Sequence, residues 1–343
     1  MKLLKIHTIA FMMILVALMA SCRDELCYDH YPHLGVSLTW EHEWERDYGM
    51  NHSVNWDASV QGIDYDALRP GKPEWVNIHL FSPDGSHRES YMDNDGDYIT
   101  VEANVNHSLL LYNGDTEYII LSDLATPPKA RASATDRSRA SLTYVSSLHP
   151  NSRTTNPPDI LYSAYLSQVD AIGNHENRSI TVKMKPLVYT YIIRYEFEYG
   201  NEHIALARGA LGGMAEAVYL IDGRTSDDST IILYDCEIKD YGCQAQVMSF
   251  GAPGLPDEFY SKADDNSPER HYTLNLEVRL KNGNFVEYNI DVSDQIKNQP
   301  RGGLIKVSGL RIEDKDSSSE AGFNITVEDW GEREDIELPV TPE

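Results

Sequence analysis

The chain has few cysteines, few basic residues and none of the common catalytic motifs. Its 343 residues include 4 cysteines, 29 lysines and arginines, and 54 aspartates and glutamates, so the formal net charge at pH 7 is −25. A surface this acidic repels nucleic acid and anionic lipid, which is evidence against functions that bind either in a basic groove. The sequence has no His-Glu-x-x-His, no Gly-x-Ser-x-Gly and no P-loop, so we expect no enzyme, no cofactor and no metal site.

The N-terminal segment carries the one pronounced apolar run. Lys2 and Lys5 precede apolar residues 6–20, and the small residues Ala20 and Ser21 follow before Cys22. The run is too short to span a bilayer comfortably, and its order of charged, apolar and small residues is typical of a secretory signal peptide. We therefore expect residues 1–21 to be a cleaved leader.

The end of this leader resembles the lipobox of bacterial lipoproteins. That resemblance implies cleavage before Cys22 and acylation of this cysteine with fatty acids such as palmitate, followed by a tether over residues 22–32. Several acyl chains hold a protein on a membrane because each buried methylene contributes about 0.8 kcal/mol. Arg23, Asp24 and Glu25 resemble the tag that sends lipoproteins of Bacteroidota across the outer membrane. The resemblance thus implies a lipid-anchored protein that faces the cell exterior.

Three cysteines remain beyond Cys22. Cys236 and Cys243 flank a short segment and could form a local disulfide in an oxidising compartment, or remain a buried pair of free thiols. A zinc site is disfavoured because the sequence has no second Cys or His pair at ligand spacing. Cys27 lies in the tether and has no predicted role.

Alternating apolar and polar residues predict many β-strands. The alternation runs over residues 191–199, and it recurs over 272–280 and 286–292, two runs separated by Asn282-Gly283, which is typical of a hairpin turn. Many short strands with turns between them indicate an all-β sandwich architecture. Shorter patterns predict strands at 36–44, 75–81, 98–105, 108–112, 117–121, 179–185, 231–237, 304–308 and 323–330.

Two glycine-rich or alanine-rich segments are expected to lie outside the strands. Residues 204–220 contain Gly209, Gly212 and Gly213, each of which weakens a helix by about 1 kcal/mol relative to Ala, so we expect a crossover loop with one short helix at most. Residues 126–139 contain almost no large apolar side chain and predict an exposed loop. The domain boundary is expected at Lys185-Pro186, which gives domains over 33–185 and 186–343.

The segment from Trp40 to Glu45 admits two interpretations. Two acids beside aromatic rings are typical of sugar-handling sites and would suit a glycosidase pair. Strand alternation gives the alternative, in which Trp40 and Trp44 share a core face while Glu41 and Glu43 are solvated. The alternation is the favoured explanation.

Most of the chain after the leader resembles the fimbrillin-like lipoproteins of Bacteroidales. The resemblance rests on the Lys185-Pro186-Leu187 join, the 109–115 stretch and the terminal 322–330 stretch. It implies two tandem transthyretin-like, Greek-key β-sandwiches and assembly by donor-strand exchange, a form of β-augmentation. It also implies a terminal or donor strand around Phe323, Ile325 and Val327, and proteolytic processing after an exposed arginine, for which the candidates are Arg131, Arg137 and Arg139.

Two functions are therefore open at this point. The first is a non-enzymatic fimbrial anchor or accessory subunit in cell adhesion, whose partners are other fimbrial subunits and host or bacterial surface ligands. The second is a glycan-binding surface lipoprotein of an outer-membrane uptake system, with Trp40, Trp44, Trp56 or Trp75 stacking on sugar rings. A flat platform of exposed aromatic rings would favour glycan binding, whereas a groove along an unpaired strand edge would favour assembly.

Overall fold

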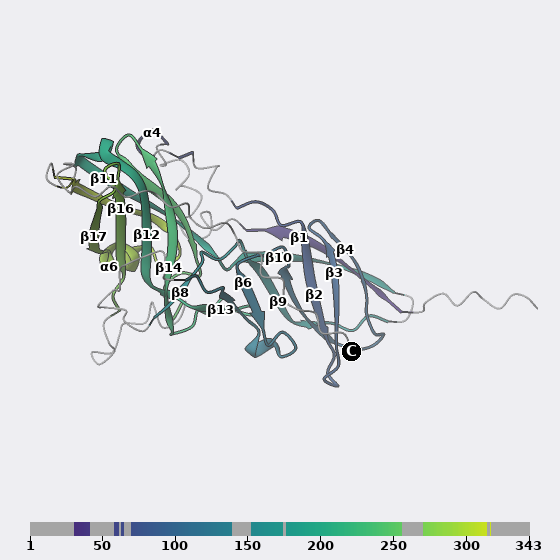
Figure 1. Cartoon of the computed structure of the whole chain (residues 1–343). Coiled ribbons are helices and arrows are strands. Elements are labelled where there is room, and N and C mark those ends of the chain that lie inside the picture. The colour runs from purple at the N-terminus through teal and green to yellow at the C-terminus, as the bar shows by residue number, and fades with distance from the viewer. Residues whose placement is uncertain are drawn as a thin grey trace, which may run out of the picture.

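A computed structural model describes residues 31–41, 58–61, 63–64, 70–138, 152–173, 176–255, 270–313 and 316. These residues are almost entirely β-structure and form two β-sandwiches side by side (Figure 1), which confirms the predicted fold class. The helices to which bounds can be given within the described ranges are short: α4 (Ala58–Gln61), α6 (Ser293–Asn298), and the one-turn η2 (Pro127–Lys129) and η4 (Asn201–His203). In the described part of the chain, no helix is long and apolar enough to cross a membrane.

The N-terminal sandwich has the strand order β3-β2-β5-β9-β10-β1-β4. Strand β10 connects its two layers, because its first eight residues pair in parallel with β1 while Lys185 and Pro186 pair with β9. The strands are β1 (His33–Trp40), β2 (Trp75–Phe81), β3 (His87–Asp93), β4 (Gly96–Thr100), β5 (His107–Asn113), β9 (Tyr162–Val169) and β10 (Asn177–Pro186).

The C-terminal sandwich follows directly, in the order β17-β16-β12-β14-β15-β11-β18. The predicted hairpin at Asn282-Gly283 is confirmed: Gly283 has φ 91°, and the Leu280 N–H donates to the Asn284 carbonyl at 2.8 Å. The strands are β11 (Tyr189–Tyr199), β12 (Ile204–Ala215), β14 (Ser229–Lys239), β15 (Gly242–Ser249), β16 (Thr273–Leu280), β17 (Phe285–Asp291) and β18 (Gly303–Arg311).

A third, small sheet joins the two sandwiches. It has the order β13-β7-β6, with β6 (Ile119–Ser122) and β7 (Arg131–Ala134) from the first half of the chain and β13 (Ala217–Tyr219) from the second. Strand β8 (Arg153–Thr155), also from the first half, pairs in parallel with β14. Figure 1 shows β6, β8 and β13 between the two sandwiches. The two halves are therefore linked by shared strands as well as by the chain connection at 186–189.

The small sheet explains why the exposed loop predicted for 126–139 is wrong. Ala130, Ala132 and Ala134 are almost fully buried in a separate apolar cluster between the sandwiches. Alanine side chains allow β7 to approach its neighbours closely, so burial here needs no large apolar residue. The cluster also includes Leu110, Tyr112, Leu161, Leu187, Val188, Val218, Leu220 and Phe250.

The crossover loop predicted for 204–220 is also wrong, because this segment forms β12 and β13. Gly209 sits in β12 because it leaves room for a ring: a Cβ at this position would lie 2.3 Å from the ring of Tyr234. Tyr234 is buried, and its hydroxyl lies 2.8 Å from the hydroxyl of Tyr195. Gly209 therefore serves side-chain packing within a strand.

Candidate subunit-docking site

A groove opens on the N-terminal sandwich where β9 and β10 separate. Its volume is about 300 Å³, and it reaches from these two strands to the start of β11 and the loop after β13. Leu166 and Val182 at the groove belong to the core of the N-terminal sandwich, whereas Leu187 and Leu220 belong to the cluster between the sandwiches. The groove thus lies where the apolar core of the N-terminal sandwich meets the cluster between the sandwiches.

Strand β9 presents an unpaired backbone edge to this groove. One edge of β9 pairs with β5 along most of its length, but the other pairs with β10 only at Tyr162 and Ser163. Residues 164–169 have no ladder partner on that second edge among the described strands. An edge of this kind is a template to which another chain can add a strand through main-chain hydrogen bonds.

The rim of the groove is basic in an otherwise acidic protein. Lys183, Lys185 and Arg301 line it. Lys183 contacts Glu41 at 3.2 Å, while the guanidinium of Arg301 lies 6.0 Å from the ring centre of Tyr189. Complementary charge steers association and fixes register, so this rim suits a strand that carries acidic residues.

The groove lacks the pair of carboxylates that glycoside hydrolysis uses. Its lining includes one carboxylate, Asp222, and neither histidine nor cysteine. Asp222 lies 3.9 Å from the guanidinium of Arg224. The glycosidase interpretation therefore finds no support in the lining of this groove.

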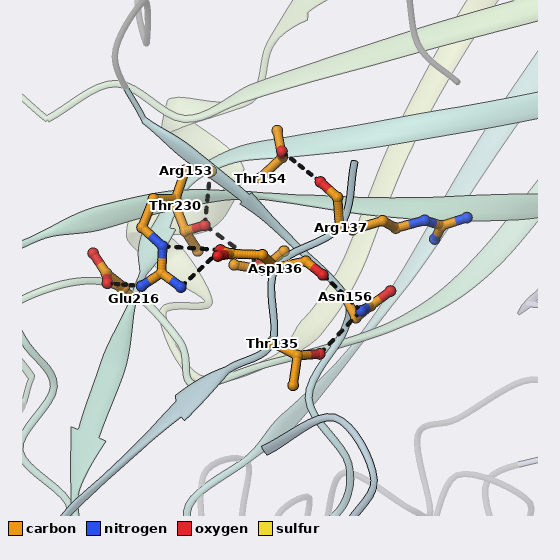
Figure 2. A network of polar contacts seen from close by, with 9 residues as sticks. Thr135, Asp136, Arg137, Arg153, Thr154, Asn156, Glu216 and Thr230 are labelled. Carbon is orange, nitrogen blue, oxygen red and sulfur yellow. Dashed lines mark hydrogen bonds and ion pairs between the residues drawn. The ribbon is translucent and has the colours of Figure 1, made fainter. Parts of the chain in front are cut away.

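A polar network fixes β8 onto the C-terminal sandwich (Figure 2). The guanidinium of Arg153 donates to Asp136 at 2.7 and 3.0 Å and also pairs with Glu216. The hydroxyl of Thr230 donates to the Arg153 carbonyl at 2.9 Å. Charge-assisted bonds to two carboxylates hold the arginine more firmly than neutral bonds would. A strand of only three residues is thereby held at the edge of the sheet beside β14.

The same network holds Arg137, one of the three candidate processing sites. Its guanidinium donates to the Leu233 carbonyl at 2.7 Å and to Asp235 at 3.1 Å. Its backbone N–H donates to the Thr154 carbonyl at 2.9 Å, and its carbonyl accepts from the Thr154 hydroxyl at 2.7 Å. Arg137 is thus half-buried and bonded at both backbone and side chain, in contrast to the exposed position expected for it.

The other two candidate processing sites, Arg131 and Arg139, differ from Arg137. The side chain of Arg131 is exposed, but its backbone lies in β7, which is paired on both sides with β13 and β6. Arg139 lies outside the described residues. Whether any of the three is a processing site stays a prediction.

We predict that the folded protein resists an arginine-specific protease at Arg131 and Arg137. A protease needs an extended segment in its cleft, and both backbones are engaged in hydrogen bonds that only opening of the structure releases. Limited digestion followed by mass spectrometry of the peptides measures this, with digestion in urea as the control that cuts at both. A prompt cut after Arg137 under native conditions would contradict the prediction.

The predicted cysteine pair lies at the turn between β14 and β15. Cys236 and Cys243 are free thiols in the structure, half-buried and buried respectively. A hydrogen bond to Cys243, together with burial, raises the pKa of the Cys236 thiol. The two thiols are in contact, and a disulfide between them stays a prediction.

Other predicted site residues lie outside the described part of the chain. These are the lipidation site and its following tag, Cys22, Arg23, Asp24 and Glu25, and the terminal-strand residues Phe323, Ile325 and Val327.

Of the four tryptophans considered for glycan stacking, the structure describes Trp40 and Trp75, and both pack against neighbouring groups. Trp40 packs edge-on against Tyr162 with ring centres 4.9 Å apart, and its indole N–H donates to the Asn94 carbonyl at 3.1 Å. Trp75 covers Gly114, where an added Cβ would lie 2.3 Å from the indole. Trp44 and Trp56 lie outside the described residues.

The structure is that of a tandem β-sandwich protein with an unpaired strand edge beside a groove, and comparison with known proteins identifies its family. A family model described as a domain of unknown function (DUF5119) matches residues 45–235, more than half of the sequence, so the chain belongs to this family. No curated protein matches it by sequence.

Solved structures share the fold. A candidate adhesin from Bacteroides ovatus ATCC 8483 is similar at 17% identity and a TM-score of 0.56, over 85% of this chain and 95% of that one. The fimbrial anchor protein Mfa2 from Porphyromonas gingivalis is similar at 11% identity and a TM-score of 0.46, over 80% and 90% of the two chains. The similarity of the first confirms the tandem β-sandwich fold.

Proposed function

We propose that this protein is a surface lipoprotein that acts as an anchor or accessory subunit of a fimbria in cell adhesion. The observation that carries the proposal is the unpaired edge of β9 beside an apolar groove with a basic rim. Such an edge can receive an extended strand from another subunit by β-augmentation. The shared fold with the Bacteroides ovatus adhesin supports a role of this class.

Attachment to the membrane is part of this proposal. Acylation of Cys22 would hold the chain on the outer membrane, and the tag at Arg23, Asp24 and Glu25 would direct it to the exterior. The partner is then another fimbrial subunit whose donor segment carries acidic residues to match Lys185. Host or bacterial surface ligands would be contacted by the assembled fimbria.

A photocrosslinking experiment tests the docking site. A photoreactive residue at Thr181, an exposed position that lines the groove, is expected to capture a fimbrial subunit on intact cells. Mass spectrometry of the same sample shows whether Cys22 is acylated. Capture of no subunit from cells that make fimbriae would contradict the proposal.

A charge-reversal variant tests whether the basic rim of the groove contributes to docking. Lys185→Glu is expected to reduce capture several-fold, because it places a like charge opposite an acidic donor strand. Lys129→Glu is the matched control, since Lys129 is exposed in η2 and does not line the groove. Equal capture by the two variants would show that the basic rim has no part in docking.

A further inference from the structure

Three side chains with metal-binding atoms converge on the β2–β3 hairpin of the N-terminal sandwich. His79 on β2 is the register partner of Glu89 on β3, and His87 lies two residues before Glu89. Alternate residues of a strand share a face, so His87 and Glu89 point to the same side as His79. Across the described residues, this is the one group of three His, Cys, Asp or Glu side chains whose ligand atoms lie within 4.8 Å of one another.

We propose that His79, His87 and Glu89 form a binding site for a zinc ion. One oxygen of Glu89 lies 3.2 Å from Nε2 of His87 and 3.8 Å from Nδ1 of His79. A tetrahedral zinc ion with bonds of about 2.0–2.2 Å holds its ligand atoms about 3.4 Å apart. The two measured separations lie on either side of that value, so small side-chain rotations complete the site.

An unpartnered buried nitrogen points to the ion independently. The His79 side chain is 2% exposed, and its Nδ1 is buried with no hydrogen-bond partner. Leaving a buried polar atom unsatisfied costs about 1–3 kcal/mol, so such an atom calls for an explanation. Nδ1 lies within 4.8 Å of the ligand atoms of His87 and Glu89, and a bound cation would satisfy it.

The remaining atoms of His79 are arranged as they are in metal-bound histidines. Its Nε2 lies 2.9 Å from the hydroxyl of Tyr112. When Nε2–H donates to this oxygen, the tautomer leaves Nδ1 free to bind a metal, and outer hydrogen bonds of this type fix ligand orientation.

The other two ligands are described by the ring stacking of His87 and by the solvent exposure of His87 and Glu89. His87 stacks on His79 with ring centres 5.7 Å apart and an interplanar angle of 3°, and it also stacks on Phe81. The side chains of His87 and Glu89 are 30% and 67% exposed, so solvent reaches the site and water can fill the fourth position. Two imidazoles and one carboxylate favour zinc over calcium or magnesium, which prefer all-oxygen ligands. The ion would tie the edge strand β3 to β2.

Isothermal titration calorimetry of the metal-free protein with zinc tests the proposal. One zinc ion per chain is expected to bind, and both His87→Ala and Glu89→Gln are expected to weaken binding by about 10-fold or more. Both residues are exposed on an edge strand, so these variants should fold, and circular dichroism checks that. His203→Ala is the control, because His203 lies 3.5 Å from Glu202 on the other sandwich without a third ligand.

Cobalt provides a second readout, because its absorption spectrum reports the ligand atoms. The protein loaded with Co²⁺ is expected to show no sulfur-to-metal charge-transfer band, since the site contains no thiolate. Absence of saturable zinc binding, unchanged affinity in His87→Ala, or a thiolate band from the cysteine pair would each overturn the proposal.

Discussion

Above pH 10, the free energy of unfolding is expected to fall by several kcal/mol for each pH unit. Burial raises the pKa of Tyr195 and Tyr234 well above the usual value of 10, and it raises the pKa of Tyr112, Tyr272 and Tyr288 to about 12. The unfolded chain loses these protons near pH 10 while the folded protein keeps them. Each such group lowers stability by about 1.4 kcal/mol per pH unit.

The direction of these pKa shifts fixes the pH range in which stability is lost. The contribution of these tyrosines is fully present below pH 10 and is lost as the pH rises toward their folded-state pKa values. Five groups together lower stability by about 7 kcal/mol per pH unit, so a protein with a stability of about 5–15 kcal/mol unfolds within one to two units above pH 10. Urea unfolding at a series of pH values between 8 and 11.5 measures the slope.

Single substitutions assign the slope to particular residues. Tyr234→Phe is expected to reduce the pH slope by about 1.4 kcal/mol per unit, whatever its effect on stability at pH 8. Tyr91→Phe is the control, because Tyr91 is 76% exposed. Identical slopes in the wild type and Tyr234→Phe would show that this buried hydroxyl does not control alkaline unfolding.

The second large effect is expected at Gly209, where Gly209→Ala should lower the free energy of unfolding by about 2–5 kcal/mol. The new Cβ would meet ring atoms and the hydroxyl of Tyr234 at 2.3 to 2.6 Å. The ring is enclosed by the core, so it can move only by disturbing its neighbours and losing the 2.8 Å contact between its hydroxyl and that of Tyr195.

Chemical denaturation of the wild type and of Gly209→Ala measures this loss of stability. Gly71→Ala is the matched control, because a Cβ there would meet nothing within 4 Å and the backbone is not left-handed. Its stability should stay within about 0.5 kcal/mol of the wild type. A loss at Gly209 no larger than that at Gly71 would mean that the ring of Tyr234 has room to shift.

The strands that the sequence predicts well are those with large alternating side chains. Residues 191–199 fall within β11, and residues 272–280 nearly match β16. Large apolar side chains are buried at alternate positions in β16 and at Tyr191, Ile193 and Tyr195 in β11. The sequence pattern does not predict β7 and β12, because alanine and glycine form part of their buried faces. A neighbouring ring or sheet fills the space that large side chains would otherwise occupy. Strand β3 was missed for the opposite reason, because all but Met92 of its residues are exposed.

The candidate sites depend on contacts that no local pattern contains. The groove exists because β10 pairs with β1 up to Met184 and with β9 from Lys185. The alternation of apolar and polar residues continues across this point, so the sequence pattern does not reveal the change of partner. The zinc ligands come from two strands, and His79 would pass for a core residue if its neighbours on β3 were unknown. By contrast, Cys236 and Cys243 are close in sequence on either side of a turn, so their contact could be predicted.

The pairing of β1 with β10 has a mechanical consequence. The two strands run in parallel over eight residue pairs, from His33 with Asn177 to Trp40 with Met184. The start of β1 and the end of β10, which leads into the C-terminal sandwich, therefore lie at opposite ends of this ladder. Tension between the N-terminal side of the chain and the C-terminal sandwich would load all of these hydrogen bonds together in shear, the direction in which a β-ladder resists rupture best, instead of peeling them apart one by one.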